Sequence, residues 1–113
     1  MIFDKKGNNI TVATQESGSL LTFLSRFKES YAKIKNDNIV VNLFSLGKLT
    51  GDDVLEFLEI SNKHRAENKS FVIVTNKVNY DEIPDELEIV PTLQEAFDII
   101  DMEEIERDLE FGE

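Results

Sequence analysis

Two short apolar runs constrain the fold of this chain more than any other feature. The segments "NIVVNLF" at 38–44 and "SFVIVT" at 70–75 are rich in β-branched residues and lack the polar alternation of a half-exposed strand. Such runs are typical of strands that helices cover on both faces, as happens in parallel sheets. We therefore predict an α/β fold in which both runs are central, parallel strands.

The remaining patterns predict the elements around these strands. "MIFD" and "NITVATQ", separated by a turn at 5–8, indicate a leading hairpin. A helix opened by Ser17-Gly18-Ser19 should follow, and a second helix should lie between the two apolar runs. The residues expected to face the core are Leu20, Leu24, Phe27, Tyr31 and Ile34 in the first helix and Val54, Phe57 and Leu58 in the second. With a strand at "LEIV" and a final helical region, the predicted order is β-β-α-β-α-β-(α)-β-α, a mixed central sheet with helices packed against it.

The final helical region changes its apolar face partway along. Thr92 and Glu95 have the spacing of a capping box, and the first apolar face consists of Leu93, Ala96, Phe97 and Ile100. A second stripe, formed by Met102, Ile105 and Leu109, points elsewhere if the helix continues. Because Asp101 offers a new cap, we predict a break or bend there, dividing a domain at 1–100 from an acidic helical extension at 101–113 that belongs to it. The stripe should fold back onto the core, or else make a dimer or partner contact.

Composition narrows the classes of function. A chain of 113 residues fits one domain, and 12 Lys and Arg against 23 Asp and Glu give a formal charge of -11, which disfavours nucleic-acid binding. From Asp81 onward the only basic residue is Arg107. No apolar run approaches the ~20 residues of a membrane span, and the N-terminus lacks the apolar core of a secretory signal. With no cysteine present, we expect a cytoplasmic protein.

The sequence contains no recognisable catalytic or metal-binding motif. His64 is the only histidine, and near a helix end we expect it to be solvated or favoured by the helix dipole. The carboxylates at 81–86 lack the spacing of a calcium loop and are expected to form a solvated acidic loop. We therefore predict that the protein is not an enzyme and that it holds no cofactor or metal.

The order of elements, with "VVNLFSL" in the central strand and "PTLQEAF" in the final helix, resembles the STAS domain, the fold of bacterial anti-sigma factor antagonists. In that family the loop after the central strand carries an Asp-Ser-Ser-Gly motif, whose first serine is phosphorylated by the partner anti-sigma kinase. In register the motif falls on Thr50-Gly51-Asp52-Asp53, so that glycine stands at the position of the phosphorylated serine. Thr50 is the one hydroxyl left in it.

The resemblance implies a single STAS-like domain that acts as a non-catalytic regulatory protein-interaction module. Its partner would be an anti-sigma factor-like or other regulatory protein with a basic surface. The residues expected to bind it are Leu46, Gly47, Lys48, Thr50, Gly51, Asp52, Asp53 and Glu56. Thr50 and Asp53 also have the spacing of a capping box, which accounts for them structurally. We expect the protein to be a monomer or a weak homodimer. The alternative function is a structural or assembly protein that homodimerises or binds an enzyme subunit through its acidic C-terminal helix.

Overall fold

The computed structural model describes residues 2–7, 9–15, 19–45, 49–78 and 80–111. Its strands are β1 (Ile2–Lys6), β2 (Ile10–Thr14), β3 (Asn38–Asn42), β4 (Phe71–Val74) and β5 (Glu88–Val90). Its helices are α1 (Leu20–Ile34), α2 (Gly51–Leu55), α3 (Leu58–Ala66) and α4 (Leu93–Phe111), with a 3-10 turn at Tyr80–Glu82. The predicted α/β class and order of elements are confirmed, except that α2 and α3 replace one expected helix.

The sheet has the strand order β1-β2-β3-β4-β5. β1 is antiparallel to β2, and each later neighbour is parallel to the one before, so the sheet is mixed as predicted. The two apolar runs lie side by side at its centre, with Val40 opposite Val72 and Val41 opposite Ile73. Their lack of polar alternation follows from this position, because both faces of these strands are buried.

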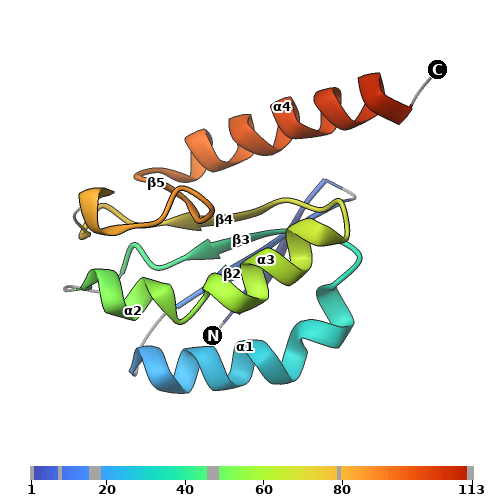
Figure 1. The fold of residues 1–113 in the computed structure, drawn as a ribbon. Helices are drawn as coiled ribbons and strands as arrows, with labels where there is room; N and C mark the ends of the chain where they lie inside the picture. The colour runs from blue at the N-terminus through green and yellow to red at the C-terminus, as the bar shows by residue number, and fades with distance from the viewer. Residues whose placement is uncertain (1, 8, 16–18, 46–48, 79, 112–113) are drawn as a thin grey trace.

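Helices form one layer on each face of the sheet (Figure 1). Val41 and Ile73 pack on one face with Phe27 of α1, Val54 of α2 and Phe57 between α2 and α3. The alternate side chains point to the other face, where α4 covers them with a core cluster whose buried members are Ile10, Val12, Val40, Val72, Val74, Val90, Ala96 and Ile100. The sheet therefore separates α1, α2 and α3 from α4.

The predicted break near Asp101 is wrong, because α4 is one helix from Leu93 to Phe111 (Figure 1). This segment contains neither glycine nor proline, so nothing in it forces the helix to end. Side chains in the second half of α4 also form hydrogen bonds at the N-terminal ends of β3 and β4. Asn38 donates to Glu104, and Ser70 donates to Glu103. These bonds hold the helix along the sheet.

The expectation that the stripe folds back onto the core is also wrong. Met102, Ile105 and Leu109 are 61%, 59% and 74% exposed. At about 100° per residue they lie on the side of α4 opposite Ala96 and Ile100, which are fully buried. An unbroken helix cannot turn both faces to the same sheet.

The split between α2 and α3 has a local cause. The amides of Glu56 and Phe57 bond to the carbonyls three residues earlier, of Asp53 and Val54, so the last turn of α2 tightens. The Ser61 amide then bonds to the Phe57 carbonyl and restarts the α pattern. None of the helices in the described part of the chain has the length and hydropathy of a bilayer-spanning segment.

Candidate functional site

The candidate site lies where β3 ends and the chain leads to α2. Ligands of open α/β sheets bind at the carboxyl ends of the parallel strands, which makes this edge the natural place for recognition. Leu43 and Leu49 are buried and anchor both sides of the loop, while the Asn42 side chain accepts a bond from the Phe44 amide at 3.1 Å. The predicted site residues Leu46, Gly47 and Lys48 lie outside the described residues.

A reciprocal capping box starts α2, as the spacing of Thr50 and Asp53 predicts. The Thr50 hydroxyl accepts a bond from the Asp53 amide at 3.2 Å, and the Asp53 carboxylate accepts one from the Thr50 amide at 3.0 Å. Such caps contribute roughly 0.5–2 kcal/mol to helix stability, and the negative side chains suit the positive end of the helix dipole. The capping bonds therefore hold the backbone of the first turn of α2 in one conformation.

Gly51 has a steric role that its position in the motif does not reveal. It is buried, and a Cβ atom added there would lie 3.0 Å from Glu82 Oε2 and 3.1 Å from Glu82 Cβ. The 3-10 turn at Tyr80–Glu82 thus packs directly over the start of α2. Glycine is the residue that this close approach accommodates.

The same packing leaves a notch of about 330 Å³ lined by Thr50, Gly51, Asp52 and Glu82. Its two carboxylates oppose the tendency of a helix N-terminus to attract anions. The lining therefore disfavours a phosphate group and suits a cationic side chain of a partner. Glu82, which the sequence placed in a solvated loop, belongs to this site because the loop returns to α2.

The polar and apolar residues of this helical segment separate as the sequence predicts, except that Asp53, expected to be exposed with Asp52 and Glu56, is half-buried. Asp52 and Glu56 are exposed, whereas Val54 and Phe57 are fully buried and Leu58 is partly buried against the same core. Asp53 is half-buried because its carboxylate turns back to cap the helix. The structure thus places Thr50, Gly51, Asp52, Asp53 and Glu56 on one acidic turn, and Met102, Ile105 and Leu109 on the other side of the sheet.

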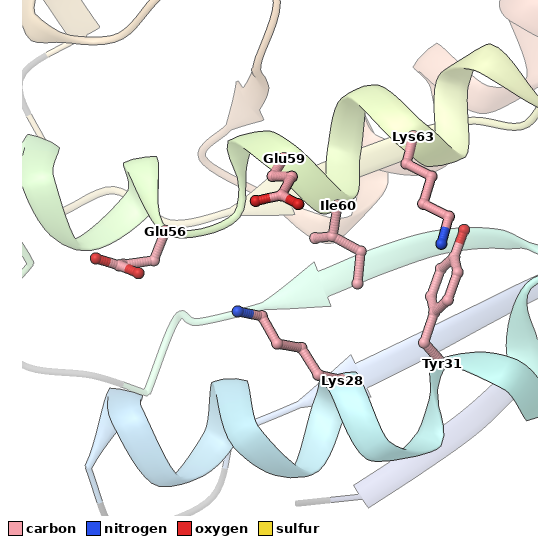
Figure 2. A pocket seen from close by; sticks show the side chains of 6 residues that line it. All are labelled: Lys28, Tyr31, Glu56, Glu59, Ile60 and Lys63. Carbon is pink, nitrogen blue, oxygen red and sulfur yellow. The ribbon is translucent and has the colours of Figure 1, made fainter.

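A groove between α1 and α3 adjoins this turn, because Glu56, which belongs to the turn, also lines the groove (Figure 2). The groove holds about 290 Å³, and its lining consists of Lys28, Tyr31, Glu56, Glu59, Ile60 and Lys63. Figure 2 shows Lys28 reaching from α1 toward the opposite helices, while the Lys63 ammonium lies 5.9 Å from the centre of the Tyr31 ring. Two lysines and two glutamates balance one another here, so the groove adds no strong charge of its own.

His64 is buried, and the prediction of a solvated histidine is wrong. Its Nδ1 lies 2.7 Å from the Tyr31 hydroxyl, and its Nε2 lies 2.7 Å from the Asp37 carbonyl oxygen. Because a carbonyl only accepts, Nε2 carries the proton and Nδ1 accepts from Tyr31. Burial lowers the pKa of His64 below its ordinary value, so that the neutral form prevails. Helical spacing turned His64 inward, where it packs edge-on against Phe71.

Both ring nitrogens of His64 are engaged in hydrogen bonds within the fold. Among the residues that the structure describes, no three or more His, Asp or Glu side chains are grouped so that they could hold a metal ion. The site provides a negatively charged surface at the start of α2, where the capping box holds the backbone.

Comparisons with known proteins do not assign this chain to a family. No family model matches it, and a search of curated proteins finds no match. Its function must therefore be inferred from the residues and the geometry described above.

Proposed function

We propose that this protein is a non-catalytic, STAS-like regulatory module of the cytoplasm that binds a protein partner through the acidic α2 turn. The α2 turn comprises Thr50, Gly51, Asp52, Asp53 and Glu56, and the loop at 46–48 leads into it. The partner is a regulatory protein, of the anti-sigma factor type or another, with lysine or arginine on its contact surface.

The proposal rests on one observation. The capped start of α2 presents exposed carboxylates near the C-terminal ends of the parallel strands. Capping fixes the backbone, so little ordering is needed when a partner binds. Asp52 and Glu56 lie at the exposed rim, where charge governs the rate of association and the choice of partner. The formal charge of -11 directs this surface to basic proteins and away from nucleic acid.

Glycine at the position of the phosphorylated serine supports a form of the family's mechanism that phosphorylation does not switch. Gly51 has no hydroxyl, and the Thr50 hydroxyl already accepts the capping bond from Asp53. A phosphoserine would add about -1.5 to -2 charge. Asp52, Asp53 and Glu82 place negative charge around the same point permanently. The α2 turn would therefore either resemble the phosphorylated, released state of a STAS antagonist or select a different, basic partner.

The variant Asp52→Lys/Glu56→Lys tests this proposal, because it reverses two exposed charges and leaves the capping pair Thr50 and Asp53 intact. We expect the free energy of unfolding to change by about 0.5 kcal/mol or less, as is usual for surface substitutions. Partner binding, measured after affinity capture from the native cell, should weaken most at low salt, since screening already weakens exposed charges at high salt.

The matched control is Asp4→Lys/Glu29→Lys, which makes the same change of charge at exposed positions on β1 and α1. The control should retain partner affinity. Equal weakening by both variants would mean that net charge rather than the α2 turn determines binding. Unchanged affinity of Asp52→Lys/Glu56→Lys at low salt would contradict the proposal and direct attention to α4.

A further inference from the structure

The outer face of α4 carries an apolar stripe that no residue in the described part of the chain covers. Met102, Ile105 and Leu109, here called the α4 stripe, are 61%, 59% and 74% exposed. α4 is the outermost element on its side of the sheet (Figure 1). Single exposed apolar residues are ordinary, but three at positions i, i+3 and i+7 of one helix form the pattern by which helices anchor in grooves.

The exposed charged residues that α4 itself places beside the stripe are acidic. The exposed acidic residues on this helix include Asp98, Asp101, Glu106 and Asp108. Arg107, the one basic residue of α4, turns inward, where its Nη2 lies 3.3 Å from both Asn38 Oδ1 and Ser70 Oγ. The outer face is therefore an apolar strip bordered by the carboxylates of α4, although Glu106 and Asp108 also line hollows with Lys69 and Arg107, and Lys6 lies over the Phe97 ring.

These charges decide between the classes of occupant. A second copy packing α4 against α4 would bring the acidic borders together, and an anionic lipid surface or a nucleic acid would be repelled in the same way. A border of Lys or Arg would instead pair with these carboxylates. We propose that the α4 stripe docks into an apolar groove of a second protein whose rim carries lysine and arginine.

The helix is held ready for such docking by its inner polar face. Glu103 accepts bonds from Ser70 and, at 3.1 Å, from Arg65, while Glu104 accepts bonds from Asn9 and Asn38. These contacts fix the second half of α4, so binding need not order it. The inference does not depend on the proposed function, because the α2 turn and the α4 stripe lie on opposite faces of the sheet.

The test uses the intact chain and a synthetic probe, an amphipathic helical peptide made of leucine and lysine. A peptide of the same composition in scrambled order, without an apolar face, is the control probe. Fluorescence anisotropy should show the amphipathic peptide binding at least about tenfold more tightly than the scrambled one. The variant Ile105→Ser/Leu109→Ser should lose at least about tenfold in affinity for the amphipathic peptide.

Leu21→Ser provides the matched control variant, since Leu21 is 77% exposed on α1, across the sheet from α4. It should bind the amphipathic peptide like the original chain, and circular dichroism should show all variants folded. Equal binding of the two peptides, or an equal loss in Leu21→Ser, would overturn the proposal. So would sedimentation equilibrium that shows a homodimer abolished by Ile105→Ser/Leu109→Ser, because the α4 stripe would then be a self-interface.

Discussion

Mild acid should destabilise this protein through His64. The ring lies in the core between Tyr31 and the Asp37 carbonyl, with Nδ1 accepting one hydrogen bond and Nε2 donating the other. A second proton would turn Nδ1 into a donor facing the Tyr31 hydroxyl and would put a charge in a dry site. Burial lowers the pKa of His64 most, followed by the opposing effect of the Asp37 carbonyl, with Lys69 nearby lowering it further.

The size of the effect follows from proton linkage. A histidine in the unfolded chain titrates near pH 6.5, whereas folded His64 binds its proton only at a lower pH. Its contribution to stability is therefore complete above about pH 6.5 and is lost as the pH falls toward the folded pKa, at about 1.4 kcal/mol per pH unit. Between pH 7.5 and 5.5 the loss is at most about 1.4 kcal/mol, reached if folded His64 stays neutral throughout.

The assay compares urea unfolding of the original chain and of His64→Gln at pH 7.5 and pH 5.5, followed by circular dichroism. Glutamine does not titrate and can still donate to the Asp37 carbonyl, so the difference between the two pH dependences isolates His64. The remaining residues are the same in both proteins. If both lose the same stability on acidification, or if His64→Gln loses more, the argument from the buried neutral ring is wrong.

Two further predictions concern the start of α2. Thr50→Ala should lower the free energy of unfolding by about 1 kcal/mol, because the Asp53 amide loses its capping acceptor, and Thr50→Ser should restore it; urea unfolding distinguishes the two, and equal stability of Thr50→Ala would contradict the cap. Gly51→Ala should cost about 1–3 kcal/mol by crowding Glu82, and Glu82→Gly in the same chain should relieve part of that cost; without relief, the crowding is not the cause.

The central strands and their partners could be predicted from the chain because their patterns are local. The unbroken apolar character of "NIVVNLF" and "SFVIVT" requires cover on both faces, and the structure buries Val40, Val41, Val72 and Ile73 completely. The capping box of Thr50 and Asp53 depends on two side chains three residues apart, and it formed as expected. For the strands, the composition of each segment is sufficient to predict burial on both faces. For the capping box, the interacting groups are close in sequence.

The errors arose where a residue's partner lies far along the chain. His64 was expected to be solvated because it lies near a helix end, but helix α3 turns it toward Tyr31 and Asp37, 33 and 27 residues away. The carboxylates at 81–86 are exposed as predicted, but the packing of Glu82 on Gly51 was not foreseen, because it depends on the segment after β4 folding back over α2. The stripe at Met102 suggested a second helix, since nothing local shows that Asn38 and Ser70 would bond to Glu104 and Glu103.

The sequence by itself therefore determined the class of fold, the central strands, the capped starts of α2 and α4 and the acidic character of the surface. These depend on side-chain periodicity, capping and charge, which act over a few residues or over the whole composition. Tertiary structure decided which faces stay exposed. Helix α4 can bury only one side against the sheet, and its contacts with the strands leave the α4 stripe exposed. On the other face of the sheet, the packing of α3 against α1 buries His64 beside Tyr31.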